Sequence, residues 1–115
     1  MKVIIAGGRD FDDYKFLCYF CNKVLKDCQE IEIVSGTANG ADKLGERFAK
    51  DNGYLLKQFP ANWDLFGKSA GYKRNEQMAE YSDFLIAFWD GKSKGTRHMI
   101  EIAKKNNLTV KVCHY

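Results

Sequence analysis

An alternation of short apolar runs with segments of helical periodicity constrains the fold of this chain more than any other feature. Strands are predicted at residues 2–6, 30–35, 54–59, 83–88 and 108–113. Helices are predicted at about 12–27, 40–52, 70–81 and 95–106, with a loop over 60–68. Strands that alternate with helices of this length pair in parallel through right-handed crossovers. The pattern therefore predicts an α/β fold, a Rossmann-like three-layer sandwich with a parallel five-stranded sheet of order 3-2-1-4-5.

The first predicted strand, Val3-Ile4-Ile5-Ala6, is continuously apolar, which is typical of a strand buried on both faces of a parallel sheet. The 115 residues suit one core, and no repeat or linker is visible, so we expect one domain over residues 1–115. In this strand order the chain reverses direction between the first and fourth strands. Ligands of such sheets bind at that reversal, beyond the carboxyl ends of the strands.

The charge pattern and the apolar runs restrict the classes of partner. The net charge of +3 is dispersed along the chain, which argues against a protein whose main partner is a nucleic-acid backbone. No signal peptide is visible, and no apolar run approaches the roughly 20 residues that a membrane span needs. We therefore expect a soluble cytoplasmic protein that does not engage a membrane.

The cysteines allow two interpretations. Cys18-x-x-Cys21 is the spacing of a redox or metal pair. A helix over 12–27, however, places Cys21 and Cys28 with apolar side chains, where a free thiol behaves as a small hydrophobe. No second Cys-x-x-Cys or His-x-x-His completes a zinc set. We expect structural cysteines and no metal site.

The turn after the first strand offers groups for a phosphate or a ribose. Gly7 and Gly8 allow close approach of the backbone, and Arg9 supplies a fork of donors. Asp10 either caps a helix or accepts from a ribose hydroxyl. The alternative to a binding role is a tight structural turn in which Arg9 is simply solvated.

The turn after the second strand is rich in small and hydrogen-bonding residues, namely Ser35, Gly36, Thr37, Asn39 and Gly40. They would let an anion sit near the start of the next helix. Asp42 either faces a ligand hydroxyl or simply favours the positive end of that helix.

The segment 60–75 adds an aromatic residue and a cation. Trp63 is expected either to stack on a base or to pack beneath its loop. Arg74 and Asn75 are expected to open the helix over 70–81. Because a helix N-terminus is already positive, an arginine there favours a functional role, and Arg74 is our candidate for a catalytic residue.

The turn after the fourth strand runs through Trp89, Asp90, Gly91, Lys92, Ser93, Gly95 and Thr96. A buried strand that ends in a glycine turn and opens a helix presents free N–H groups to phosphate. Thr96 is expected to cap this helix or to contact phosphate. The segment is not a Walker A loop, because Ile86 stands where that loop needs its first glycine. We therefore expect no magnesium-dependent phosphoryl transfer and no cofactor.

Six motifs span nearly the whole chain: Gly7-Gly8-Arg9-Asp10-Phe11, Gly40-Ala41-Asp42, Phe59-Pro60-Ala61-Asn62-Trp63, Gly67-Lys68-Ser69-Ala70-Gly71, Arg74-Asn75-x-x-Met78 and Ile86-Ala87-Phe88-Trp89-Asp90-Gly91-x-Ser93-x-Gly95-Thr96. In this order they resemble the YspA/cpYpsA-related branch of the SLOG superfamily. The resemblance implies a Rossmann-like fold and a pocket for a nucleotide or a nucleotide-derived ligand. It is also compatible with a homodimer.

The superfamily includes the LOG phosphoribohydrolases, which release a base from a nucleoside monophosphate. Residues of their motifs retained here are Arg74, Met78, Gly91, Gly95 and Thr96. Met99 replaces their glutamate, and Glu101 lies about 200° further around the helix. Glycoside hydrolysis benefits from a carboxylate near the forming oxocarbenium ion, and neither residue supplies one at the position of that glutamate. We therefore predict a binding module, with a nucleotide N-glycosidase as the alternative. A module that binds single-stranded nucleic acid, as the related DprA proteins do, or another protein is a third hypothesis.

Overall fold

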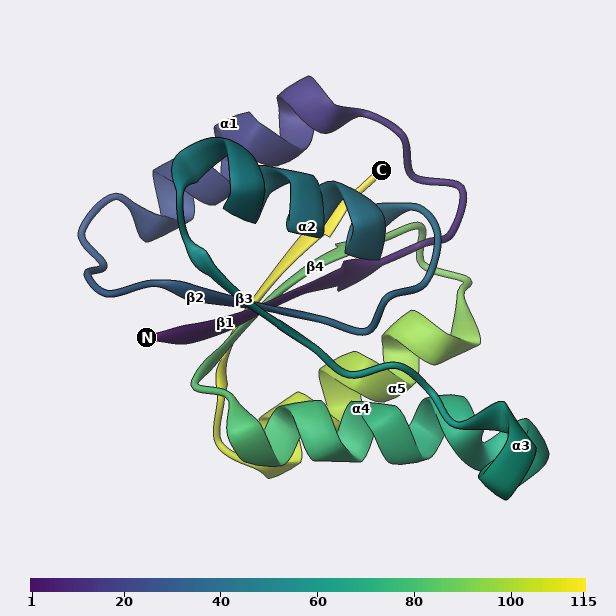
Figure 1. Cartoon of the computed structure of the whole chain (residues 1–115). Helices are drawn as coiled ribbons and strands as arrows, with labels where there is room; N and C mark the ends of the chain where they lie inside the picture. Colours follow the sequence, from purple (N-terminus) through teal and green to yellow (C-terminus); the bar gives the residue numbers. More distant parts are fainter.

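The computed structural model describes all 115 residues as a parallel sheet between two helical layers (Figure 1). The strands are β1 (Lys2–Gly7), β2 (Glu32–Ser35), β3 (Leu55–Gln58), β4 (Phe84–Trp89) and β5 (Thr109–His114). The helices are α1 (Tyr14–Leu25), α2 (Ala41–Asn52), α3 (Trp63–Phe66), α4 (Ala70–Tyr81) and α5 (Lys94–Lys105), with a 3₁₀ turn η1 at Gly67–Ser69. The sheet order is β3-β2-β1-β4-β5 and every pair is parallel. The predicted Rossmann-like α/β fold and strand order are confirmed.

The two helical layers enclose separate apolar clusters. Figure 1 shows α1 and α2 on one face of the sheet, with α4 and α5 on the other. Val3 and Ile5 of β1 belong to the cluster under α1 and α2, whereas Ile4 belongs to the cluster under α4 and α5. All three are fully buried. The alternation explains why the sequence of β1 is apolar without interruption, because each face of the strand meets its own helical layer.

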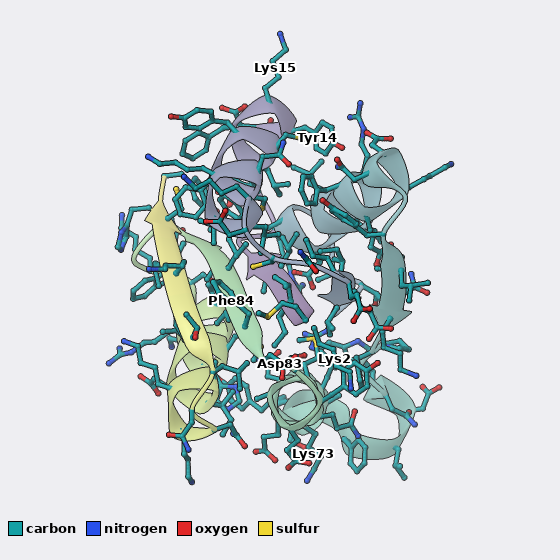
Figure 2. The ribbon with its side chains drawn as sticks, turned by 90° about the vertical axis from the view of Figure 1, so that its left-hand side faces the viewer. Lys2, Tyr14, Lys15, Lys73, Asp83 and Phe84 are labelled. Atoms are coloured by element: carbon teal, nitrogen blue, oxygen red, sulfur yellow. The ribbon has the colours of Figure 1, made fainter.

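The amino ends of the two central strands are joined directly. Lys2 N donates to Asp83 Oδ2 at 2.9 Å, and Asp83 N donates to Lys2 O at 2.9 Å. Figure 2 shows Lys2 and Asp83 beside each other, with Tyr14 and Lys73 on opposite sides of the molecule. Polar pairing thus closes one edge of the sheet. The opposite edge, at the carboxyl ends of the strands, is where the turns carry glycines and charged side chains.

The largest difference from expectation lies between β3 and α4. Residues 60–68 were expected to form a loop, but they contain α3 and most of η1. The Asn62 side chain caps α3 by accepting from Leu65 N at 3.1 Å. A helix of four residues is too short to show a periodic pattern of apolar residues. The capping residue Asn62 was therefore the one sequence feature that could have indicated α3.

The residue before the helix supplies a side-chain cap for both α1 and α5. Asp13 caps α1 by accepting from Phe16 N at 3.1 Å. The cap of α5 is Ser93, and its hydroxyl accepts from Thr96 N at 3.4 Å. Thr96, which was expected to cap this helix or to contact phosphate, therefore lies inside the first turn of α5 and is not its cap.

Cys21 and Cys113 are buried in the apolar cluster under α1, while Cys18 and Cys28 are half-buried beside it. All four thiols are free. None of the helices combines the length and the apolar character that a membrane crossing requires.

The contact of α2 with β1 yields a stability prediction. A Cβ at Gly45 would lie 2.8 Å from Cβ of Ile5, so Gly45→Ala overpacks this contact. We expect the free energy of unfolding to fall by about 1–3 kcal/mol in chemical denaturation, despite the better helix propensity of alanine. Gly95→Ala is the matched control, because nothing lies within 4 Å of its added Cβ. An equal effect of both substitutions would contradict the packing explanation.

Candidate functional site

The turns that follow β1, β2 and β4 meet at the carboxyl edge of the sheet. Gly8 N donates to Phe88 O at 3.1 Å, and Ala41 N donates to Gly8 O at 3.1 Å. Gly40 has φ +79°, and a Cβ there would collide with Gly8 O. Only glycine therefore lets the second turn approach the first this closely.

A cavity of about 240 Å³ lies over these turns, between α4 and α5. The predicted site residues that line it are Gly7, Arg9, Asp42, Trp63, Arg74, Asn75, Ser93, Gly95 and Thr96. A neighbouring hollow of about 270 Å³ is lined in addition by the predicted residues Gly36, Thr37 and Asn39. Arg9, Trp63 and Arg74 line both spaces. Residues far apart in the chain are thus brought to one place.

The charged groups of the cavity are mostly cationic. Arg9, Lys68 and Arg74 line it, against the single carboxyl of Asp42. Arg9 and Lys68 are exposed and have no ion-pair partner within the chain. Two cations are therefore free to meet an anion from solution.

Arg74 is held by the backbone of the second turn. Its Nη1 donates to Gly36 O, and its Nε donates to Asn75 Oδ1 at 3.1 Å. A Cβ at Gly36 would lie 2.9 Å from that Nη1, so a side chain there would displace the guanidinium. Arg74 is the fifth residue of α4 rather than its first. The argument from the helix dipole therefore does not apply, and the Gly36 carbonyl accounts for its place.

Asn75 joins α4 to the start of α5. It is buried, and its Nδ2 lies 3.3 Å from Gly95 O and 3.1 Å from His98 Nδ1. The ring of His98 lies 4.3 Å from that of Tyr72, which lines the cavity. The sequence indicated no partner for His98, because its partners come from another helix.

The wall opposite the turns is aromatic and apolar. Trp63 is 52% exposed and Tyr72 is 46% exposed, whereas Met78 and Met99, which also line the cavity, are buried. Trp63 was expected either to stack on a base or to pack beneath its loop. Its exposure agrees better with a ring that is accessible from the cavity than with one packed beneath the loop. Met99 occupies the cavity wall in the position where the LOG motif has its glutamate.

Asp42 is the one carboxyl of the cavity and is 5% exposed. Burial raises its pKa to about 6, although the Ala38 N–H, 3.2 Å from Oδ2, and the nearby Arg74 both lower it. The carboxyl therefore changes charge close to neutral pH, which is typical of groups in functional sites.

Ser35 shapes the second turn without lining either space. Its hydroxyl donates to Glu46 Oε2 at 2.7 Å and accepts from Thr37 N at 3.0 Å. The turn is therefore fixed from its buried side.

The turn after β4 satisfies part of its own backbone. Asp90 Oδ1 accepts from Lys92 N and Ser93 N, both at 2.8 Å, and these bonds lower the pKa of Asp90. Trp89 Nε1 donates to Ser93 O at 3.1 Å. Two of the N–H groups expected to face a phosphate are thus engaged, and the residues of this segment that line the cavity are Ser93, Gly95 and Thr96.

The predicted residues outside both spaces are Gly8, Asp10, Ser35, Gly40, Trp89, Asp90, Gly91 and Lys92. Lining residues that the sequence analysis did not select are Ala6, Ala38, Pro60, Ala61, Lys68, Gly71, Tyr72, Met78 and Met99. Lys68 and Gly71 belong to the Gly67–Gly71 motif, so the sequence did indicate that this segment could contribute to the site. Tyr72 had no signal, because its exposure depends on how α4 meets α5.

The fold and this edge define a doubly wound α/β protein with a cationic pocket at the switch point of its sheet. The chain belongs to the YspA, cpYpsA-related SLOG family, whose model matches residues 1–66. It is also similar to the Gene 61 protein of Mycobacterium phage D29, at 30% identity over 116 residues that cover 95% of this chain and 93% of that protein. The family match ends before α4, so Lys68, Arg74 and Gly95 lie outside it.

Buried Asp42 should make stability depend on pH. Its pKa in the folded state, about 6, exceeds the ordinary 3.8, so between these values the folded protein binds more protons than the unfolded chain. The free energy of unfolding should therefore fall by about 2 kcal/mol as the pH rises from about 4 to 6, because the whole shift corresponds to about 3 kcal/mol at about 1.4 kcal/mol per pKa unit and its ends lie outside this interval. Chemical denaturation of Asp42→Asn should lack this slope, while Asp27→Asn, on the surface, should retain it. A slope that persists in Asp42→Asn would contradict the assignment.

Proposed function

We propose that this chain binds a nucleotide or a nucleotide-derived ligand in the cavity at the carboxyl edge of the sheet. The observation that supports this most is the convergence of Arg9, Lys68 and Arg74 on one cavity whose single carboxyl is buried. A guanidinium binds phosphate through paired, charge-assisted hydrogen bonds. Family membership also suggests a nucleotide-related function.

The two ends of a nucleotide suit different parts of this cavity. The phosphate would lie near Arg9, Arg74 and the backbone at Gly95, where α5 begins and its dipole favours an anion. The base would lie against Trp63 or Tyr72, whose exposed rings offer faces for stacking. The cavity and the hollow beside it, at about 240 and 270 Å³, are together on the scale of small-molecule sites.

Calorimetric titration with adenosine 5′-monophosphate tests the proposal. We expect one site, and Arg9→Ala should weaken binding by at least about tenfold, because a charge-assisted hydrogen bond contributes about 1.5–3 kcal/mol. Arg97→Ala is the control, since Arg97 pairs with Glu101 at 3.1 Å and does not line the cavity. Equal affinity in wild type and Arg9→Ala, or no binding of any nucleoside mono- or diphosphate, would contradict the proposal.

A nucleotide N-glycosidase is the second candidate, favoured by Asp42 beside Arg74 in the same cavity. A buried carboxyl with a raised pKa can donate a proton to a leaving base. Met99 argues against the mechanism of the LOG enzymes, because a thioether supplies no negative charge to an oxocarbenium ion.

Chromatography of nucleoside monophosphates incubated with the protein separates these two functions. The binding proposal predicts no free base. If the protein is a hydrolase, base accumulates and Asp42→Asn or Arg74→Ala slows its release by at least about a hundredfold. Release that is the same in wild type and both variants would indicate a contaminating enzyme.

A further inference from the structure

We propose that Tyr115 is a positioning residue that holds the turn carrying Arg9 in the form that faces the cavity. The inference rests on the proposed function, because Arg9 is one of the two free cations of that site. It concerns a residue beyond β5 that lines neither the cavity nor the neighbouring hollow.

Tyr115 is fixed by the sheet and by aromatic packing. Its backbone N donates to Trp89 O at 3.2 Å, which extends the pairing of β5 with β4 by one residue. Its ring lies 4.9 Å from that of Phe11, and Phe11 stacks on Phe88 of β4 at 4.8 Å. The Tyr115 side chain is therefore held in place beside the first turn by its backbone bond to β4 and by its packing on Phe11.

The Tyr115 hydroxyl meets the turn on both sides of Arg9. It donates to Asp10 Oδ1 at 2.6 Å, and it lies where a Cβ of residue 8 would stand, so Gly8 leaves the room for it. Asp10 is thereby engaged within the chain instead of facing a ligand. The backbone of the turn adds three bonds: Gly8 N donates to Phe88 O at 3.1 Å, and Gly8 O accepts from Phe11 N at 3.3 Å and from Ala41 N at 3.1 Å.

The Arg9 side chain has no ion-pair partner that would orient it. Its direction toward the cavity is therefore set by the backbone on either side. The single Tyr115 hydroxyl, which donates to Asp10 and lies against Gly8, restricts that backbone before a ligand arrives. Restricting it beforehand reduces the ordering cost of binding.

Tyr115→Phe removes the hydroxyl and leaves the ring on Phe11. Tyr14→Phe is the matched control, because the Tyr14 hydroxyl donates to Asp51 at the same 2.6 Å but lies between α1 and α2. Without ligand, we expect the Gly8 and Phe11 amides of Tyr115→Phe to exchange with deuterium at least about fivefold faster than in wild type. In Tyr14→Phe these amides should exchange at the wild-type rate.

A double-mutant cycle then tests whether Tyr115 acts through Arg9. It measures the affinity for adenosine 5′-monophosphate in the wild type, in Tyr115→Phe, in Arg9→Ala and in the double variant. Tyr115→Phe should weaken binding about fivefold in the wild-type background and less than about twofold in Arg9→Ala. Asp10→Asn, which keeps an acceptor oxygen, should bind more tightly than Asp10→Ala. Unchanged amide exchange, or equal fold-losses in both backgrounds, would overturn the proposal. If wild type binds no nucleotide, the proposed function fails, and the amide exchange alone decides whether Tyr115 holds the turn.

Discussion

The close approach of the second turn to the first is the constraint on which the rest of this site depends. Ala41 N binds Gly8 O, and Gly40 lacks the Cβ that would keep the two backbones apart. This contact places Gly36 where its carbonyl accepts from Arg74 of α4, on the other side of the sheet's edge. This backbone contact and the Arg74–Gly36 bond together connect the two helical layers above the strand ends.

Electrostatics at this edge follow from the same geometry. Asp42 is buried because α2 starts beneath the second turn, and burial holds its pKa near 6. Arg9 stays exposed because its turn is fixed by backbone bonds and by Asp10, without the guanidinium. Burial disfavours the ionised form of the Asp42 carboxyl, whereas the cationic side chains of Arg9 and Lys68 are exposed to solvent. The positive charge is therefore the more accessible, which favours an anionic ligand.

Much of this arrangement could be predicted from the sequence. Apolar runs and helical periods were sufficient for the strand order, because parallel strands joined by helices have few topologies. The same reasoning anticipated a ligand site at the reversal between the first and fourth strands, beyond the carboxyl ends of the strands. It could not anticipate the partners of individual side chains: Asp10 meets Tyr115 across 105 positions, and Asn75 meets His98 from another helix. The N–H groups of Lys92 and Ser93 looked free in sequence, and only the structure shows that Asp90 occupies them.

The central claim is that turns from three separate strands form a single anion-binding pocket. A titration with adenosine 5′-monophosphate followed by amide NMR tests it most directly, because each turn reports separately. We expect saturable shifts that share one dissociation constant at Gly7, at Gly36 and Ala38, and at Gly95. Shifts confined to one of these turns, or centred on α1 or β5, would contradict the claim.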